Sequence, residues 1–235
     1  MKRFYKDVSV EPLEGGCQIL LDRRPVRTPA RLPLSLPSLA LADAVAEEWR
    51  SQGEEIDPRA MPLTGLANAA IDRVLPDPAA FARGLAAYGE SDLLCYRAEG
   101  PEVLIEREEQ LWDPLLAWAR HRFDIDFEIT SGILHRPQPK RTIEQLARAV
   151  AAKDAFVLAA LSPLVTISGS LVIALALLER AIDLDTAWSA ATVDEAWQAE
   201  KWGEDFEATA RLEARRKEFA AAHRFVELLE ERADA

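Results

Sequence analysis

Apolar and polar residues alternate with a short period in the first third of the chain, and turn residues interrupt the alternation. Residues 4–10 carry β-forming side chains separated by polar ones, and residues 17–22 repeat this pattern after Glu14-Gly15-Gly16. Two such segments joined by a glycine turn are typical of a β-hairpin. Ser38 precedes a helical pattern over residues 39–50 and is placed to cap that helix. We therefore expect hairpins and one helix in this region.

From Thr64 onward the apolar positions recur with the period of a helix. Pro114 is expected to break or restart the helix predicted over residues 101–123. The last predicted helix, over residues 206–231, is amphipathic. Its apolar stripe consists of Leu212, Phe219, Val226 and Leu229.

The predicted fold class is α+β, because the two parts of the chain follow different periods. The first part, residues 1–63, is expected to be a small N-terminal domain with antiparallel β-hairpins and one helix. The second, residues 64–235, is expected to be a larger all-α C-terminal domain, an orthogonal helical bundle.

Residues 155–178 are the most apolar stretch and are long enough to raise the question of a membrane span. Ser162-Pro163 and Ser168-Gly169-Ser170 divide the stretch into pieces that are too short to cross a bilayer. Two buried core helices joined at residues 168–170 account for the pattern better, and no membrane insertion is expected.

The richest local chemistry lies in residues 193–205, where two tryptophans and five carboxylates occur within thirteen residues. Thr192 and Glu195 have the spacing of a capping box, which starts a helix. Helical geometry places Glu195, Gln198 and Trp202 on one side. It places four other side chains on another side: Trp197, Glu200, Lys201 and Glu204. Such a helix is either a recognition surface or the acidic edge of a core that holds both tryptophans.

The charge of the chain argues against a nucleic-acid partner. Its 28 Lys and Arg residues face 40 Asp and Glu residues, so that the formal net charge is −12. Cys17 and Cys95 are far apart, which favours a reducing compartment. The first residues lead directly into a strand pattern, with no signal or transit segment. A cytoplasmic protein is expected.

No familiar catalytic motif emerges from the residues. The three histidines lie in separate segments, and the zincin, Walker and dinucleotide-binding spacings are missing. The carboxylates of residues 194–205 allow an acid–base or metal site to be drawn, but one helix cannot supply converging ligands alone. We expect no enzyme, no metal and no cofactor.

Several short motifs, in this order, are similar to those of a known family. They are Arg3-Phe4-Tyr5-Lys6, Arg24-Pro25-Val26-Arg27-Thr28-Pro29, Glu48-Trp49, Gln52-Gly53-Glu54, Ile56-Asp57-Pro58, Met61-Pro62-Leu63-Thr64, Leu66-Ala67-Asn68, Asp92-Leu93-Leu94-Cys95-Tyr96-Arg97, Trp112-Asp113-Pro114-Leu115-Leu116, Gly169-Ser170-Leu171-Val172 and the stretch from Val193 to Gly203. The chain resembles the assembly chaperones of the F-type ATP synthase that bind its alpha subunit, often called the ATP-twelve chaperones. Arg23 and Ser91 depart mildly from the family pattern, which often has Gly and Thr at these places.

The resemblance implies the α+β architecture described above and no ATPase activity. It implies transient binding of the free alpha subunit and shielding of the surface that later meets the beta subunit. Family members act in the bacterial cytoplasm or the mitochondrial matrix, and a monomer is expected. The expected partner-binding residues are Glu200, Asp194, Glu195, Trp197, Gln198, Trp202, Glu204 and Asp205.

Three alternatives stay open at the level of sequence. Glu200, flanked by both tryptophans, is the strongest candidate for contact with the client, but it can instead pair internally, for example with a basic residue of the last helix. The whole protein can also be a structural subunit or scaffold of a larger complex. A carboxylate-based enzyme is the third possibility.

Overall fold

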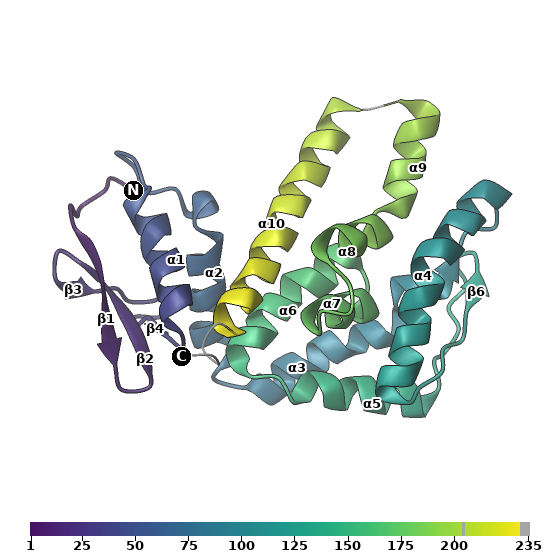
Figure 1. The fold of residues 1–235 in the computed structure, drawn as a ribbon, viewed down its shortest axis with the longest axis horizontal. Helices are drawn as coiled ribbons and strands as arrows, with labels where there is room; N and C mark the ends of the chain where they lie inside the picture. Colours follow the sequence, from purple (N-terminus) through teal and green to yellow (C-terminus); the bar gives the residue numbers. More distant parts are fainter. Residues whose placement is uncertain (204, 231–235) are drawn as a thin grey trace. The chain divides into compact units, whose positions relative to one another are not determined.

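A computed structural model describes residues 1–203 and 205–230, which form two compact units (Figure 1). The first unit comprises Met1–Pro78 together with Asp154–Ala160 and residues 221–230. The second comprises Ala79–Lys153 and Leu161–Ala220. The N-terminal part of the first unit thus ends at residue 78, and the predicted domain boundary at residue 63 stays a prediction.

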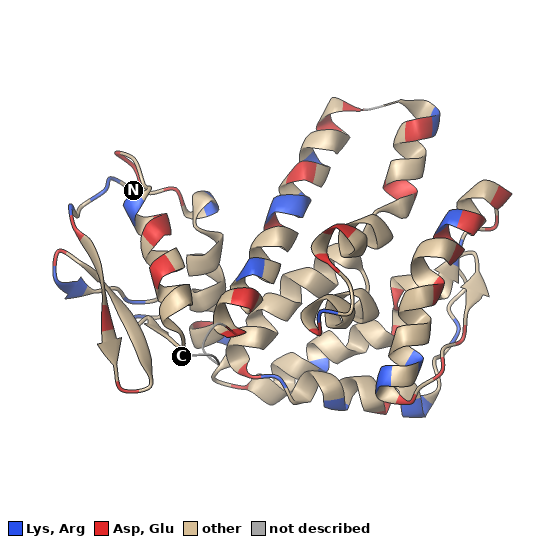
Figure 2. Ribbon diagram, in the orientation of Figure 1, with Lys and Arg blue, Asp and Glu red and all other residues tan. Residues whose placement is uncertain are grey.

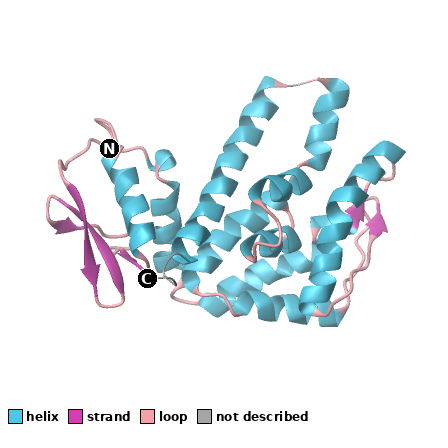
Figure 3. Ribbon diagram, in the orientation of Figure 1, coloured by secondary structure: helices cyan, strands magenta, loops and turns pink. Residues whose placement is uncertain are grey.

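The strands of the first unit form the expected antiparallel hairpin (Figure 3). Strand β1 (Val8–Leu13) pairs with β2 (Gly16–Leu21), and Gly15 adopts a φ of 83° in the turn between them. Two short strands, β3 (Arg24–Pro25) and β4 (Ser35–Leu36), also pair with β2. The sequence-based prediction of an antiparallel N-terminal region is therefore confirmed.

The loop between β2 and β3 has a backbone conformation that suits the Gly often found in the family where this chain has Arg23. Asp22 and Arg23 both have positive φ angles, 48° and 66°, as in the two-residue loops that favour glycine or asparagine. The Asp22 carboxylate compensates by accepting hydrogen bonds from the backbone N–H groups of Lys6 (3.0 Å) and Asp7 (2.9 Å). Arg23 therefore occupies a conformation that suits Gly better.

The helices of the first unit are held by side-chain caps. Helix α1 (Leu39–Arg50) is capped by Ser38, whose Oγ accepts from Leu41 N at 3.2 Å, as predicted. Helix α2 (Pro62–Ala69) is capped from outside, because the Glu48 carboxylate accepts from Leu63 N (2.7 Å) and Thr64 N (2.8 Å). Short 3₁₀ and π segments flank α2, namely η1 (Pro58–Ala60) and η2 (Ala70–Val74).

The second part of the chain is helical except for two short parallel strands, β5 (Tyr96–Arg97) and β6 (Thr130–Ser131). Its helices are α3 (Pro78–Ala86), η3 (Ala87–Ser91), η4 (Leu93–Cys95), α4 (Glu102–Phe123), α5 (Lys140–Ala151), α6 (Ala155–Ser168), α7 (Leu171–Leu178), α8 (Leu184–Ala191), α9 (Val193–Trp202) and α10 (Phe206–Glu230).

Helix α7 forms the centre of the second unit, because every one of its residues is buried. It packs against α4 and α8. The helix begins at Ser170, whose Oγ accepts from Ile173 N at 3.0 Å. The predicted pair of core helices joined at residues 168–170 is therefore present as α6 and α7. Within the described residues, no helix is both long and apolar enough to cross a membrane.

The expected break at Pro114 was wrong, since α4 continues through this residue. Proline removes one backbone hydrogen bond from a helix interior. Burial of the neighbouring Trp112, Leu115 and Leu116 against the core offsets this loss. The Trp112 indole also donates to the Ala190 carbonyl of α8 at 2.8 Å, which fixes the middle of α4 in place.

Candidate functional site

Helix α9 begins where the sequence predicted but without the predicted cap. The Thr192 hydroxyl donates backward to the Trp188 carbonyl of α8 at 2.8 Å, and no side-chain cap starts α9. The capping-box prediction was therefore wrong, because the end of α8 lies close enough to take the hydroxyl. Helix α9 packs against α4, and the chain then turns at Gly203 (φ 86°) before α10 begins (Figure 1).

The two tryptophans of α9 have opposite environments. The Trp197 side chain is 6% exposed, and two cations lie over its ring. Arg107 Cζ is 4.9 Å and Lys201 Nζ 4.4 Å from the ring centroid. The Trp202 side chain is 78% exposed. Trp197 therefore anchors α9 to α4, whereas Trp202 is open to a partner.

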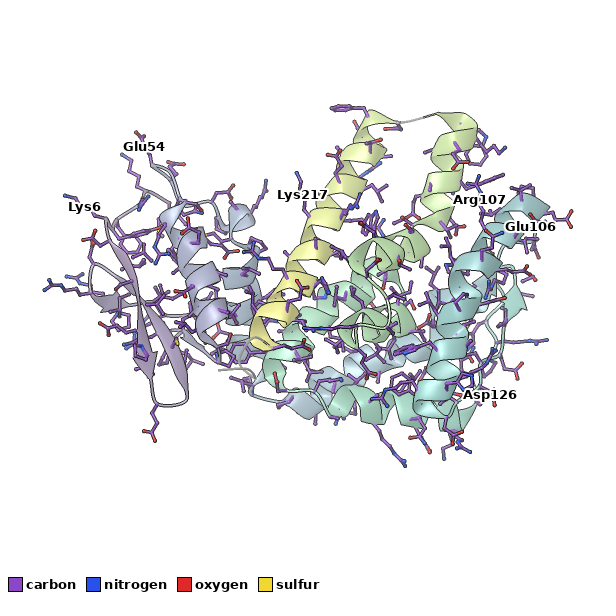
Figure 4. All side chains as sticks on the ribbon, in the orientation of Figure 1. Lys6, Glu54, Glu106, Arg107, Asp126 and Lys217 are labelled. Atoms are coloured by element: carbon purple, nitrogen blue, oxygen red, sulfur yellow. The ribbon has the colours of Figure 1, made fainter. Side chains whose placement is uncertain are left out.

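Glu200 forms an ion pair inside the second unit. Arg107 Nη1 of α4 donates to Glu200 Oε1 at 2.8 Å, and this hydrogen bond holds the pKa of Glu200 below its usual value. Figure 4 shows Arg107 on α4 near α9. The alternative of an internal pair is thus present in the structure, but the partner lies on α4 and not on the last helix. Both side chains remain exposed, so the pair contributes little to stability.

Two other predicted site residues have local partners. Arg215 of α10 donates through Nη1 to Glu195 Oε1 (3.1 Å) and through Nη2 to the Ile167 carbonyl (2.8 Å). Asp205 starts α10 by accepting from the backbone N–H groups of the first turn, at 2.8 Å and 3.1 Å. These hydrogen bonds lower the pKa of Asp205. Gln198 is exposed, and Glu204 lies outside the described residues.

Asp194 lies beside a carboxyl group that sequence analysis missed, that of Glu108 on α4. Burial, first of all, raises the pKa of both groups; the charge of Asp194 adds to the rise for Glu108, and the charge of Glu195 adds to the rise for Asp194, whereas the hydrogen bond with Glu108 lowers the pKa of Asp194. Glu108 is 1% exposed and accepts one hydrogen bond from Ala98 N at 2.9 Å. Asp194 Oδ1 is buried without a donor. A proton shared by the two carboxyl groups would satisfy that oxygen.

Two open hollows flank α9. The first, about 420 Å³, lies between α9 and α10 and is lined by Trp202, Gly203 and Leu212, among others. The second, about 880 Å³, lies between α9, α4 and the segments around β5 and β6. Trp202 borders both hollows, so one exposed aromatic side chain contributes to both parts of the surface around α9, called the aromatic edge below.

Sequence analysis also missed two exposed apolar residues near these hollows. Phe206 at the start of α10 is 89% exposed, and Ile133 after β6 is 97% exposed. Ile133 borders the second hollow. The available signal was positional, because each residue follows a glycine at which the chain turns: Gly203 for Phe206 and Gly132 for Ile133. Large apolar side chains in water next to hollows indicate a binding surface.

The surface around α9 combines aromatic and charged side chains in a way that suits another protein. Figure 2 shows acidic and basic residues interspersed along α4, α9 and the neighbouring part of α10. Among the described residues, no three His, Cys, Asp or Glu side chains are grouped to hold a metal ion. Aromatic anchors with a charged rim are typical of protein–protein interfaces. The surface around α9 therefore has the composition that is typical of a protein-binding surface.

Comparison with known proteins identifies the class more closely. The family model of the ATP12 chaperone protein matches residues 2–120. The chain belongs to the ATP12 chaperone family, as the sequence motifs predicted. The matched residues end within α4, so α9 lies beyond them.

Solved structures extend the similarity over nearly the whole chain. The crystal structure of Atp12 from Paracoccus denitrificans is 44% identical, with a TM-score of 0.91 over 97% of this chain and 98% of that one. A point mutant of Atp12p from the same organism shows the same identity and TM-score, with 97% of both chains covered. A protein from Agrobacterium tumefaciens is 43% identical, with a TM-score of 0.93 over 97% of this chain and 86% of that one.

Proposed function

We propose that this assembly chaperone serves the F-type ATP synthase, by binding its free alpha subunit and shielding the surface that later meets the beta subunit. Membership of the ATP12 chaperone family supports the chaperone class. The observation that carries the choice of surface is the exposed Trp202 at the end of α9, between two hollows and close to exposed carboxylates. In this proposal the protein works by binding and release alone.

The physical argument concerns what an unassembled subunit exposes. A subunit interface that waits for its partner presents apolar surface, which is prone to aggregation. A chaperone must cover this surface with aromatic anchors and yet release it to the true partner. Trp202 and Phe206 offer such anchors, and the Arg107–Glu200 pair lies beside them on an exposed rim.

We place the protein in the bacterial cytoplasm and expect it to act as a monomer. The α9 surface, if it binds a client, must be accessible to newly made subunits in the compartment where they fold. A self-associated form that covered Trp202 would be inactive as a chaperone.

The test is a pull-down with purified alpha and beta subunits of the synthase, each offered separately to the immobilised protein. Retention of alpha alone, followed by its release when beta is added, is the expected result. Retention of neither subunit would overturn the proposal. Co-purification of the protein with the finished synthase would instead favour a structural subunit.

Glu200→Lys sharpens the test at the level of one residue. The change places a cation beside Arg107, so the rim loses its negative charge while the exposed position tolerates the substitution. We expect weaker retention of the alpha subunit and an unchanged melting temperature. Asp185→Lys is the matched control, because Asp185 pairs with Arg216 at the same 2.8 Å on an exposed part of α8 and α10. Equal effects of both substitutions would remove Glu200 from the site.

A further inference from the structure

The second hollow contains a carboxyl group that lacks a cationic partner within the described part of the chain. Glu108 and Asp194 both line the hollow, and neither forms an ion pair with a lysine or arginine of residues 1–203 or 205–230. Buried Arg97 also lines the hollow, donates through Nη2 to Asp113 at 2.6 Å, and lowers the pKa of Glu108 through its charge. Asp194 has no such neighbour among the described residues, and its Oδ1 is buried without a donor, which is costly for an ionised carboxyl group.

The two carboxyl groups are buried to different degrees. Glu108 is almost fully buried, whereas Asp194 is only half-buried. Asp194 Oδ1 is the buried oxygen that lacks a donor. Asp194 is therefore both the less buried of the two residues and the one with an unsatisfied oxygen. Lys201 also lines the hollow, but its Nζ lies over the Trp197 ring.

Aliphatic side chains line the same hollow. Leu104 of α4 and Ile133 of the loop after β6 are two of them. Ile133 is almost completely in water, although a large apolar side chain gains about 1.5–3 kcal/mol when it is buried. A carboxylate and aliphatic side chains in one hollow complement the head and the stem of a long basic side chain.

We propose that the hollow between α4, α9 and the loop after β6 receives an arginine or lysine side chain of the client, with its cationic head on Asp194 and its stem against Leu104 and Ile133. The inference rests on the proposed function, because the client that presents this side chain is the alpha subunit. In this proposal the cation satisfies the Asp194 oxygen that lacks a donor in the free protein. Charge-assisted hydrogen bonds of this kind are about twice as strong as neutral ones.

The direct test uses a pair of blocked amino acids and does not depend on the client. N-α-acetyl-arginine amide and N-α-acetyl-citrulline amide have nearly the same shape, but only the first carries a charge. We expect saturable NMR shifts of α9 with the arginine compound, about tenfold weaker binding of the citrulline compound, and loss of the preference in Asp194→Asn. Equal binding of both compounds, or binding of neither, would overturn the proposal.

Two matched pairs of variants extend the test to the alpha subunit. Asp194→Asn should weaken its binding about tenfold, whereas Asp185→Asn, an exposed carboxylate of α8 outside both hollows, should change it about twofold or less. Ile133→Ser should also weaken binding, and Leu134→Ser, its exposed neighbour outside the hollow, should not.

The outcomes separate the two proposals. If the wild-type protein binds the alpha subunit and all four variants bind equally well, the hollow is not the client site and the chaperone function stands. If the wild-type protein does not bind the subunit, the proposed function fails, and the arginine and citrulline titrations alone decide whether the hollow binds a cation.

Discussion

Asp92 and Asp194 lie in the same unit and show how differently two shielded carboxyl groups can be treated. Asp92 is 0% exposed, and its oxygens accept from Leu94 N (3.2 Å) and Val172 N (3.0 Å), with the Ser170 hydroxyl as a further donor. Asp194 is half-buried, with one oxygen lacking any donor and another carboxyl group beside it. The oxygens of Asp92 have hydrogen-bond donors within the chain, whereas one oxygen of Asp194 has none.

This difference in hydrogen-bond partners distinguishes a carboxyl group that stabilises the fold from one that is available for binding. Asp92 caps η4 and also receives the start of α7, so it joins two helix ends in the middle of the core. Buried polar groups in folded proteins nearly always have partners, and an exception needs a reason. Asp194 is such an exception, and it borders an open hollow. We infer that Asp92 stabilises the fold, whereas Asp194 awaits a partner from outside.

The largest expected effect is that of Asp92→Ala. The substitution leaves the backbone N–H groups of Leu94 and Val172 buried without an acceptor, and each such loss costs about 1–3 kcal/mol. We expect the free energy of unfolding to fall by about 3 kcal/mol. Chemical denaturation measures it. A loss below about 1 kcal/mol would show that the hydrogen bonds of Asp92 do not stabilise the fold as argued here.

The second expected effect is on the pH dependence of stability. Burial raises the pKa of Asp92 to about 6. The folded state therefore binds more protons than the unfolded state between the ordinary carboxyl pKa of 3.8 and about 6, so stability falls as the pH rises through this window. The fall is on the order of 3 kcal/mol.

Asp92→Asn provides the control, because the amide has nearly the same size and does not titrate. Denaturation at several pH values should show a flatter profile for this variant than for the wild-type protein. An unchanged slope would assign the pH dependence to other carboxyl groups with raised pKa values, such as Glu48 or Glu108.

Glu108→Gln tests the carboxyl pair of Glu108 and Asp194, in which one oxygen lacks a donor. The glutamine amide can donate to Asp194 and still accept from Ala98 N, and the substitution removes one of two neighbouring negative charges. We expect a gain of about 1 kcal/mol in stability at neutral pH. Thermal denaturation measures it. A clear loss of stability would mean that the ionised Glu108 already has the partner that the fold requires.

Local sequence patterns predicted much of the fold but little of the candidate site around α9. Ser38 caps a helix as its position predicted, because a cap depends on residues a few positions away. The antiparallel hairpin around Gly15 follows from local alternation in the same way. Thr192 failed as a cap because its hydroxyl bonds to Trp188 of the preceding helix.

The partners of the acidic helix depend on contacts between distant segments. Sequence periodicity placed Glu200 and Trp197 on one side of α9, and Arg107 of α4 does contact both of them. The spacing within α9 could not identify Arg107, because Arg107 lies on α4, 93 residues before Glu200 in the sequence. Glu108 and Ile133 were missed for the same reason.

Trp202→Ser is expected to have the smallest effect on stability and a large one on binding. The side chain is mostly in water, so its loss should change the free energy of unfolding by about 0.5 kcal/mol or less. Binding of the alpha subunit should weaken about tenfold or more, since an aromatic anchor is removed. Phe4→Ser in the first unit, another exposed aromatic residue, is the control and should leave binding unchanged. If Trp202→Ser binds the subunit like the wild-type protein, the aromatic edge of α9 is not part of the client surface, and the incomplete carboxyl pair must be tested apart from it.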